Sequence, residues 1–327
     1  MTVKKLLIVP LAMALACGGT SSGDFSKDSA RAAMPNSVAM NTPGGTSSAA
    51  QANPNDLTAS PDAVSNDFYF GLTVSVAVTF NAPVAVFLGL VGTITQAEPT
   101  SCTATSCTWG PGSGALEANT YKLVVSMDAD GSSYDWELDG QAKSRPTSAF
   151  VTIANGVARP SGTPHHGSGS FTVNFDNANT LDGVLASAPT GKMVVSSYSN
   201  VGPAALSVTY TGATDASTNG LENIAYSYAD DSTGGGDLQF AVHNTKTSDD
   251  FSVHSRWKND GEGRADVQGA GGGLTVKDSD CWGAAPFTNV YFTSNILVNS
   301  PPFAGPTTGS PTACAFTDTV YSSLTVQ

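Results

Sequence analysis

Apolar and polar residues alternate along most of the chain in short runs that end at turn-forming residues. The clearest example is the pair of runs 121–127 and 134–138, which flank an Asp-Ala-Asp-Gly turn at residues 128–131. A period of two is the pattern of a half-buried strand, and Gly, Asn, Asp and Pro separate the further runs at hairpin-like spacing. These further predicted strands cover residues 150–154, 168–175, 192–198, 205–211, 222–228, 238–243, 251–257 and 264–268.

A different pattern fills residues 68–97, which carry no charged side chain. Residues 68–80 alternate like a strand, whereas the apolar residues beyond Pro83 fall at helical spacing. Asn81 and Pro83 interrupt the apolar run and no basic flank follows it, which argues against a membrane span. We predict a buried hairpin of two elements, with a helical second half and a first half that is either strand or helix.

Consecutive short strands joined by tight turns predict a mainly β fold, an antiparallel meander. Because each strand has one apolar face, the sheet must curl around a filling or pack on a second layer. We therefore expect a curved sheet, a half-barrel or open barrel, filled by the apolar segment 68–97. A β-sandwich is the alternative. Either arrangement predicts a single β-rich domain over residues 67–327.

The start of the chain has the composition of an exported protein. Lys4 and Lys5 precede an apolar run, residues 6–16, that is too short to span a bilayer and ends in a small residue. This pattern predicts a signal peptide over residues 1–16. Residues 17–66 are rich in Gly, Ser, Ala, Asn, Pro and Thr, and a stretch with so few large apolar side chains is expected to be a flexible tether.

The five cysteines divide into four in the body of the chain and one at its start. In a secreted context the four are free to pair, which leaves Cys17 over. Cys281 and Cys314 bracket a proline-rich, loop-like stretch that a covalent tie would anchor. Cys102 and Cys107 are spaced to close a small loop; a zinc site is the alternative for that pair. We predict the disulfides Cys102–Cys107 and Cys281–Cys314.

Cys17 directly follows the predicted signal peptide and precedes a polar leader. This position resembles the lipobox of bacterial lipoproteins, in which the cysteine is acylated and becomes the mature N-terminus. The resemblance implies lipidation of Cys17, for example by palmitate, and contact with the membrane through that acyl anchor. Gly18, rather than Asp, follows the cysteine, which implies sorting to the outer membrane, on its periplasmic face or at the cell surface. Residues 14–16 also fit ordinary signal peptidase, so a secreted protein is the alternative.

Three motifs in the body of the chain stand out together. They are Pro99-Thr100-Ser101-Cys102 with Thr108-Trp109-Gly110-Pro111; Gly167-Ser168-Gly169-Ser170-Phe171; and Ser255-Arg256-Trp257 with Gly261, Gly263-Arg264-Ala265-Asp266 and Cys281-Trp282. As a set they resemble a group of uncharacterised outer-membrane lipoproteins of the myxobacterial type, over most of residues 68–321. The resemblance implies one domain and brings no activity with it.

The charge of the chain excludes some partners. Its formal net charge is −13 and it has no basic cluster, which argues against nucleic acid and against docking on anionic lipid. Only 13% of its residues are charged, as is typical of an exported β-rich protein rather than of a cytosolic helical enzyme.

His243 and His254 are the candidate metal ligands. A hairpin that turns at residues 248–249 would place them opposite each other on one face, with Cβ atoms about 4.5–5.5 Å apart. A polar outer face that holds two histidines is the simpler interpretation, because no third ligand is in view. We therefore predict no metal and no other cofactor.

The remaining polar motifs predict turns rather than catalysis. Asp128, Asp130 and Gly131 depart from a calcium loop, and the chain contains no Gly-x-Ser-x-Gly motif. The sequence thus favours a non-enzymatic envelope lipoprotein that binds or presents a lipid or other apolar ligand. The alternative is a structural or adhesive envelope protein with no small-molecule ligand.

Overall fold

The computed structural model describes residues 25–34, 67–113, 117–182, 190–215, 220–298 and 303–326. They belong to two compact units. The first unit takes in the described residues of 25–34 and 84–201, and the second those of 67–83 and 202–326. Cys17, the predicted signal peptide and most of the predicted tether lie outside the described residues.

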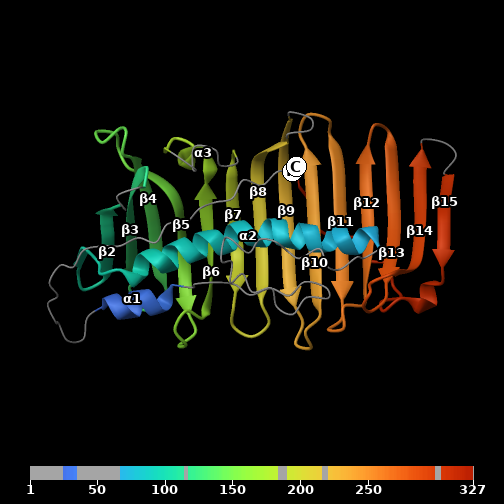
Figure 1. Ribbon diagram of the computed structural model, residues 1–327, viewed down its shortest axis with the longest axis horizontal. Coiled ribbons are helices and arrows are strands. Elements are labelled where there is room, and N and C mark those ends of the chain that lie inside the picture. The colour runs from blue at the N-terminus through green and yellow to red at the C-terminus, as the bar shows by residue number, and fades with distance from the viewer. Residues whose placement is uncertain are drawn as a thin grey trace. The chain divides into compact units, whose positions relative to one another are not determined.

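The first unit is built on antiparallel strands in sequence order, each paired with the next from β1 to β7. Figure 1 shows them as a row of arrows from blue-green to yellow-green. Its elements are α1 (Lys27–Ala33), β1 (Ser101–Cys102), β2 (Ser106–Gly112), β3 (Asn119–Met127), β4 (Tyr134–Ala142), β5 (Val151–Pro160), β6 (Gly167–Asn174), α3 (Phe175–Ala178) and β7 (Lys192–Ser199).

The second unit repeats this plan, with antiparallel pairing from β8 to β15. Its elements are β8 (Ala205–Asp215), β9 (Gly220–Asp230), β10 (Gly236–Asn244), β11 (Asp249–Trp257), β12 (Gly263–Gly271), β13 (Leu274–Trp282), β14 (Asn289–Val298), β15 (Phe303–Gly309) and the 3-10 turn η2 (Pro311–Ala313). The described chain is thus mainly β, as predicted. Its strand order is open, because β1 and β15 each have a single partner strand among the described residues.

The predicted strands between residues 121 and 268 coincide with β3–β12. The strands β1, β2, β13, β14 and β15 were not predicted, and residues 281–314 were expected to be loop-rich. In β13 the apolar periodicity is lost because Asp278 and Asp280 occupy two positions on the sheet face that packs against α2. They pair with Val267 and Ala265 of β12. Strands whose inward positions are carboxylates give no alternating hydrophobic signal.

Residues 68–97 differ from the predicted hairpin. Phe68–Gln96 is one continuous helix, α2, and Pro83 lies inside it. Residues 68–80 alternate like a strand, but they also place Phe70, Thr73 and Ala77 three to four residues apart, which is helical spacing. These three residues are buried, so the helical pattern is the one that the fold uses. Asp67 caps the helix by accepting a hydrogen bond from the Phe70 N–H at 2.7 Å. Among the helices that the structure describes, none is both long enough and apolar enough to cross a membrane.

The N-terminal half of α2 covers the apolar face of the second unit's sheet. Phe70 stacks on Phe287 with ring centroids 4.4 Å apart, and the ring of Phe80 packs against that of Phe240 at 5.2 Å. The fully buried hydroxyl of Thr73 lies 2.7 Å from that of Ser255 on β11. Aromatic contacts and a buried hydrogen bond therefore fix this half of the helix on its sheet.

The C-terminal half of α2 packs in the same way within the first unit. Phe87 contacts Phe175 with ring centroids 6.0 Å apart, and the fully buried Val84 and Leu88 lie on the same stripe. Just beyond the helix, the Trp109 indole donates a hydrogen bond to the carbonyl of Ala97 at 2.9 Å. Apolar area is buried along the whole length of α2.

Residues 25–34 lie within the segment predicted to be a tether, yet residues 27–33 of this stretch form helix α1. Ser26 and Ser29 form a capping box, and Ala30 and Met34 are fully buried. Arg31 donates to the carbonyl of Thr95 at 2.6 Å. The structure differs from the tether prediction here because this short stretch has its own cap and its own apolar face.

An extended segment covers the face of the second unit's sheet that is opposite to α2. We call residues 315–326 the C-terminal strap. Ser255 faces α2, so its chain neighbours on β11 face the other way, and there His254 lies 2.9 Å from the Val320 carbonyl. The backbone N–H of Ser323 donates to Gln239 Oε1 at 2.8 Å. The sheet of the second unit therefore lies between a helix and a strap.

Candidate functional site

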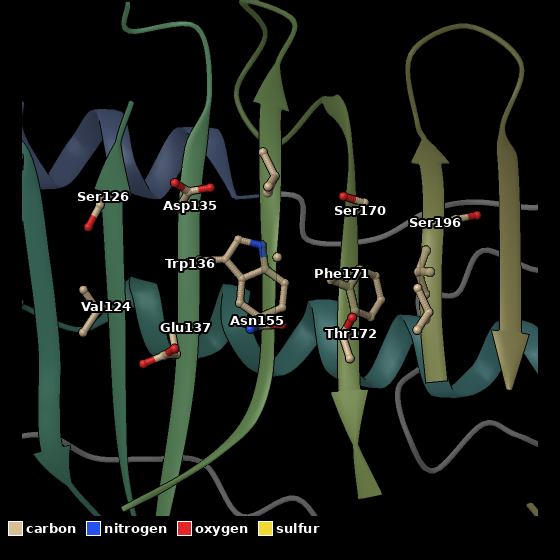
Figure 2. A pocket seen from close by; sticks show the side chains of 14 residues that line it. Val124, Ser126, Asp135, Trp136, Glu137, Asn155, Ser170, Phe171, Thr172 and Ser196 are labelled. Atoms are coloured by element: carbon tan, nitrogen blue, oxygen red, sulfur yellow. The ribbon is translucent and has the colours of Figure 1, made fainter. Parts of the chain in front are cut away.

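A shallow depression of about 660 Å³ lies on the first unit's sheet, on the face away from α1 and α2. Figure 2 shows it from that side, with both helices behind the strands. We call it the first-unit depression. Its lining residues on β3–β7 are Val124, Ser126, Asp135, Trp136, Glu137, Asn155, Gly156, Val157, Ser170, Phe171, Thr172, Val194, Val195 and Ser196.

Strand alternation positions these side chains. Phe171 is buried toward the helices, whereas Ser170 and Thr172, its neighbours on β6, face the depression. Gly156 on β5 lies between Trp136 and Phe171, and a Cβ atom there would come 2.5 Å from the Phe171 Cβ. The glycine is therefore needed for the two rings to approach, with centroids 5.9 Å apart, beneath the floor of the depression.

The lining of the depression combines polar and acidic groups with the valines Val124, Val157 and Val194. Its hydrogen-bonding groups are the hydroxyls of Ser126, Ser170, Thr172 and Ser196, the amide of Asn155, and the carboxylates of Asp135 and Glu137. No lysine, arginine or histidine is among the lining residues. Such a surface can donate and accept many hydrogen bonds over a broad area, and it favours neutral or cationic polar ligands.

A second cavity, of about 430 Å³, lies at the N-terminal end of α2 within the second unit. We call it the acidic aromatic cavity. It is lined by Asp67, Phe68, Tyr69, Asp280, Asn289, Phe292 and Thr308. The carboxyl groups of Asp67 and Asp280 are buried, with 3% and 4% of each residue exposed, whereas Phe68 is 73% exposed. The cavity thus has a buried acidic end and an accessible aromatic wall.

Hydrogen bonds organise the carboxyl groups of the acidic aromatic cavity. Asn289 Nδ2 donates to Asp280 Oδ2 at 2.8 Å and to Asp67 Oδ2 at 3.3 Å. The Tyr69 hydroxyl donates to Asp278. Burial, and then the carboxylate of Asp278, raise the pKa of Tyr69.

Asp280 holds its proton at neutral pH. Burial first, and then the adjacent Asp67 carboxyl group, raise the pKa of Asp280 from 3.8 to about 9. Between these values the folded chain keeps a proton that the unfolded chain releases. Asp280 therefore contributes a loss of stability as the pH rises through that window.

His243 and His254 do not lie opposite each other. His243 pairs with Asp250 and His254 with Gln239, because the hairpin turns through residues 245–248, earlier than predicted. His243 Nδ1 lies 2.8 Å from Asp250 Oδ1. His254 Nε2 lies 2.9 Å from the carboxylate of Asp237. Each ring has its own carboxylate, and the described residues contain no group of three His, Cys, Asp or Glu that could hold a metal ion.

The predicted cysteine pairs, Cys102–Cys107 and Cys281–Cys314, both lie at disulfide distance. The Asp128 turn is also held as turn chemistry predicts. Ser133 Oγ donates to Asp128 at 2.7 Å, and this bond and the Ser133 backbone N–H lower the pKa of Asp128 to about 2.

No protein-family model, curated protein or solved structure matches the chain. The first-unit depression and the acidic aromatic cavity are the two features of the described residues that bear on function. Ser170 and Phe171 occur in one of the three sequence motifs, but no site was predicted from the residues that line the depression or the cavity. For the acidic aromatic cavity a signal was present: Asp278 and Asp280 are spaced two apart, which places both carboxylates on one face of a strand.

Proposed function

We propose that the protein is a non-enzymatic envelope lipoprotein that acts by contact, through the first-unit depression, with a hydroxylated polymer such as a polysaccharide. One observation carries the proposal: hydroxyl, amide and carboxylate groups from five strands line one open face. Hydroxylated polymers offer matching donors and acceptors along their length. An open surface of this kind suits a ligand that is long rather than enclosed.

The other candidate function is binding or presentation of a lipid or other apolar ligand. In each unit, half of α2 covers the apolar face where such a ligand would be expected. An apolar ligand would have to displace the ring contacts of Phe70 and Phe80 and the buried hydrogen bond between Thr73 and Ser255. This cost favours the contact function.

A bulky side chain in the first-unit depression is expected to abolish polymer binding. We expect Ser170→Trp to weaken binding to purified envelope polysaccharide and to peptidoglycan sacculi at least about tenfold, because the indole would occupy the centre of the hydrogen-bonding surface. Co-sedimentation with sacculi and titration with the soluble polysaccharide measure the change.

Thr209→Trp is the matched control, since Thr209 is exposed on β8 in the second unit. It should bind both polymers like the wild type. Equal binding by Ser170→Trp and the wild type would show that the depression is not the binding site. Failure of the wild type to bind either polymer would show that a hydroxylated polymer is not the ligand.

The acyl anchor makes a separate prediction. We expect labelled palmitate to be incorporated into the wild-type chain and Cys17→Ser to lose the label completely, with release of the protein from the membrane fraction. Cys17 is the cysteine left over by the two pairs in the body of the chain. Label that persists in the Cys17→Ser variant would assign the acylation to another residue and contradict the lipobox.

A further inference from the structure

The acidic aromatic cavity has walls that suit a cation. The ring of Phe68 meets that of Tyr69 edge to face, with centroids 5.1 Å apart, and the rings of Tyr69 and Phe292 are nearly parallel at 6.4 Å. The face of an aromatic ring attracts an ammonium group placed within about 6 Å of its centre. Phe68 is largely exposed, so part of this wall is open to a ligand from solvent.

The buried end of the cavity offers an acceptor. Asp280 lines the cavity and is 4% exposed; its Oδ2 accepts from Asn289, and its proton is hydrogen-bonded to the carboxyl group of Asp67. A cation that displaces this proton would bring N–H donors to the two carboxyl groups.

The cavity is lined by acidic side chains and by no basic one. Its lining residues include two aspartates and no lysine, arginine or histidine, and Asp278 accepts a hydrogen bond from the lining residue Tyr69. Such a site favours a positive ligand. A primary ammonium group has three N–H donors, which a quaternary ammonium group lacks.

We propose that the acidic aromatic cavity binds the primary ammonium group of an alkylamine, held between the aromatic wall of Phe68, Tyr69 and Phe292 and the carboxyl groups of Asp67 and Asp280. The site lies entirely in the second unit. It is independent of polymer binding by the first-unit depression, so either function can fail without the other.

Binding is expected to release a proton. The pKa of Asp280 is raised to about 9, and the titratable groups that face it are Asp67 before α2, Tyr69 on α2 and Asp278 on β13. An ammonium ion pairs with the carboxylate form. Each bound cation therefore displaces one proton below pH 9, and the affinity rises about tenfold per pH unit.

Titration of the full chain with n-butylammonium at pH 6 and pH 8, at constant ionic strength, tests the site. The uncharged probe 1-butanol has nearly the same shape. We expect n-butylammonium to bind at least about tenfold more tightly than 1-butanol at pH 8, and up to about 100-fold more tightly at pH 8 than at pH 6.

Two variants test the acidic end and the aromatic wall of the cavity separately. Asp280→Asn should weaken n-butylammonium binding at least about tenfold and remove the pH dependence. Phe68→Ala should weaken it about two- to fivefold, as expected for an exposed cation–π contact, and Phe68 is too exposed for its loss to disturb folding. Leu221→Ala, at an exposed residue on β9, is the control and should bind like the wild type.

The alkylamine could be free or the head group of an aminolipid, and vesicles distinguish the two. If the ligand is an aminolipid, phosphatidylethanolamine vesicles should bind and compete with n-butylammonium, and phosphatidylcholine vesicles should not. Competition by neither vesicle, with n-butylammonium still bound, assigns the site to a free amine. The proposal is overturned if n-butylammonium binds no more tightly than 1-butanol, or if Phe68→Ala and a folded Asp280→Asn both bind like the wild type.

Discussion

Arg264→Met is expected to lower the free energy of unfolding of the second unit by about 3–5 kcal/mol, the usual cost of removing one partner from a buried ion pair. Arg264 and Asp266 are 2% and 0% exposed. Arg264 Nε and Nη2 lie 2.9 and 2.8 Å from Asp266 Oδ1. The substitution would leave a carboxylate buried without its bidentate partner.

The same ion pair fixes the C-terminal strap. Asp266 Oδ2 accepts the Val320 N–H at 2.9 Å, and Arg264 Nη2 donates to Thr319 Oγ1 at 2.6 Å. The Arg264→Met variant should therefore also expose the strap. Hydrogen exchange at increasing urea concentration, followed separately in β12 and in residues 315–326, measures both effects.

Two further variants test the physical cause. In the Arg264→Met variant the buried Asp266 carboxylate keeps Arg256 Nη2 at 3.3 Å and the Ser279 hydroxyl at 2.6 Å but loses its closest cation. Adding Asp266→Leu removes that carboxylate, so the double variant should be more stable than the single one. Lys258→Met breaks the exposed pair with Glu262 and should cost less than about 1 kcal/mol. A cost below 1 kcal/mol for Arg264→Met would show that the buried pair does not hold the strap.

Loss of the Cys281–Cys314 disulfide is expected to cost about 3–4 kcal/mol. The two cysteines are 33 residues apart in the sequence, and the chain-entropy cost of closing a loop of that length gives this value. Their joint replacement by alanine should also raise hydrogen exchange in the strap, which begins directly after Cys314. Chemical denaturation of the variant and the wild type measures the loss.

Joint replacement of Cys102 and Cys107 by alanine is the matched control. Their sequence separation is only 5, so the same entropy argument gives about 2 kcal/mol. The strap should exchange as in the wild type, because this pair lies in the first unit. An equal or larger loss from the short loop would contradict the chain-entropy account.

The strands could be predicted because their chemistry is local. Each segment contains its own period-two alternation and its own turn residues, and β3–β12 lie where that pattern predicts strands. The hairpin between β10 and β11 shows the limit. Its strands were predicted, but the register was displaced by the four-residue loop 245–248, and with it the position of His243 relative to His254.

The candidate sites depend on long-range placement that no local pattern specifies. Asp67 precedes α2 and Asp280 lies in β13, and no local sequence pattern indicates that both line one cavity. Thr73 and Ser255 likewise meet across 182 residues. The first-unit depression was missed for another reason: its serines and threonines are ordinary outward residues of strands, and only the assembled sheet gathers them on one face.

The most direct test of the contact function is hydrogen exchange of the full chain with and without envelope polysaccharide. The account predicts protection in β3–β7, where the lining residues of the first-unit depression lie, and unchanged exchange in β8–β15. Protection confined to the second unit, or none at a saturating polysaccharide concentration, would contradict it.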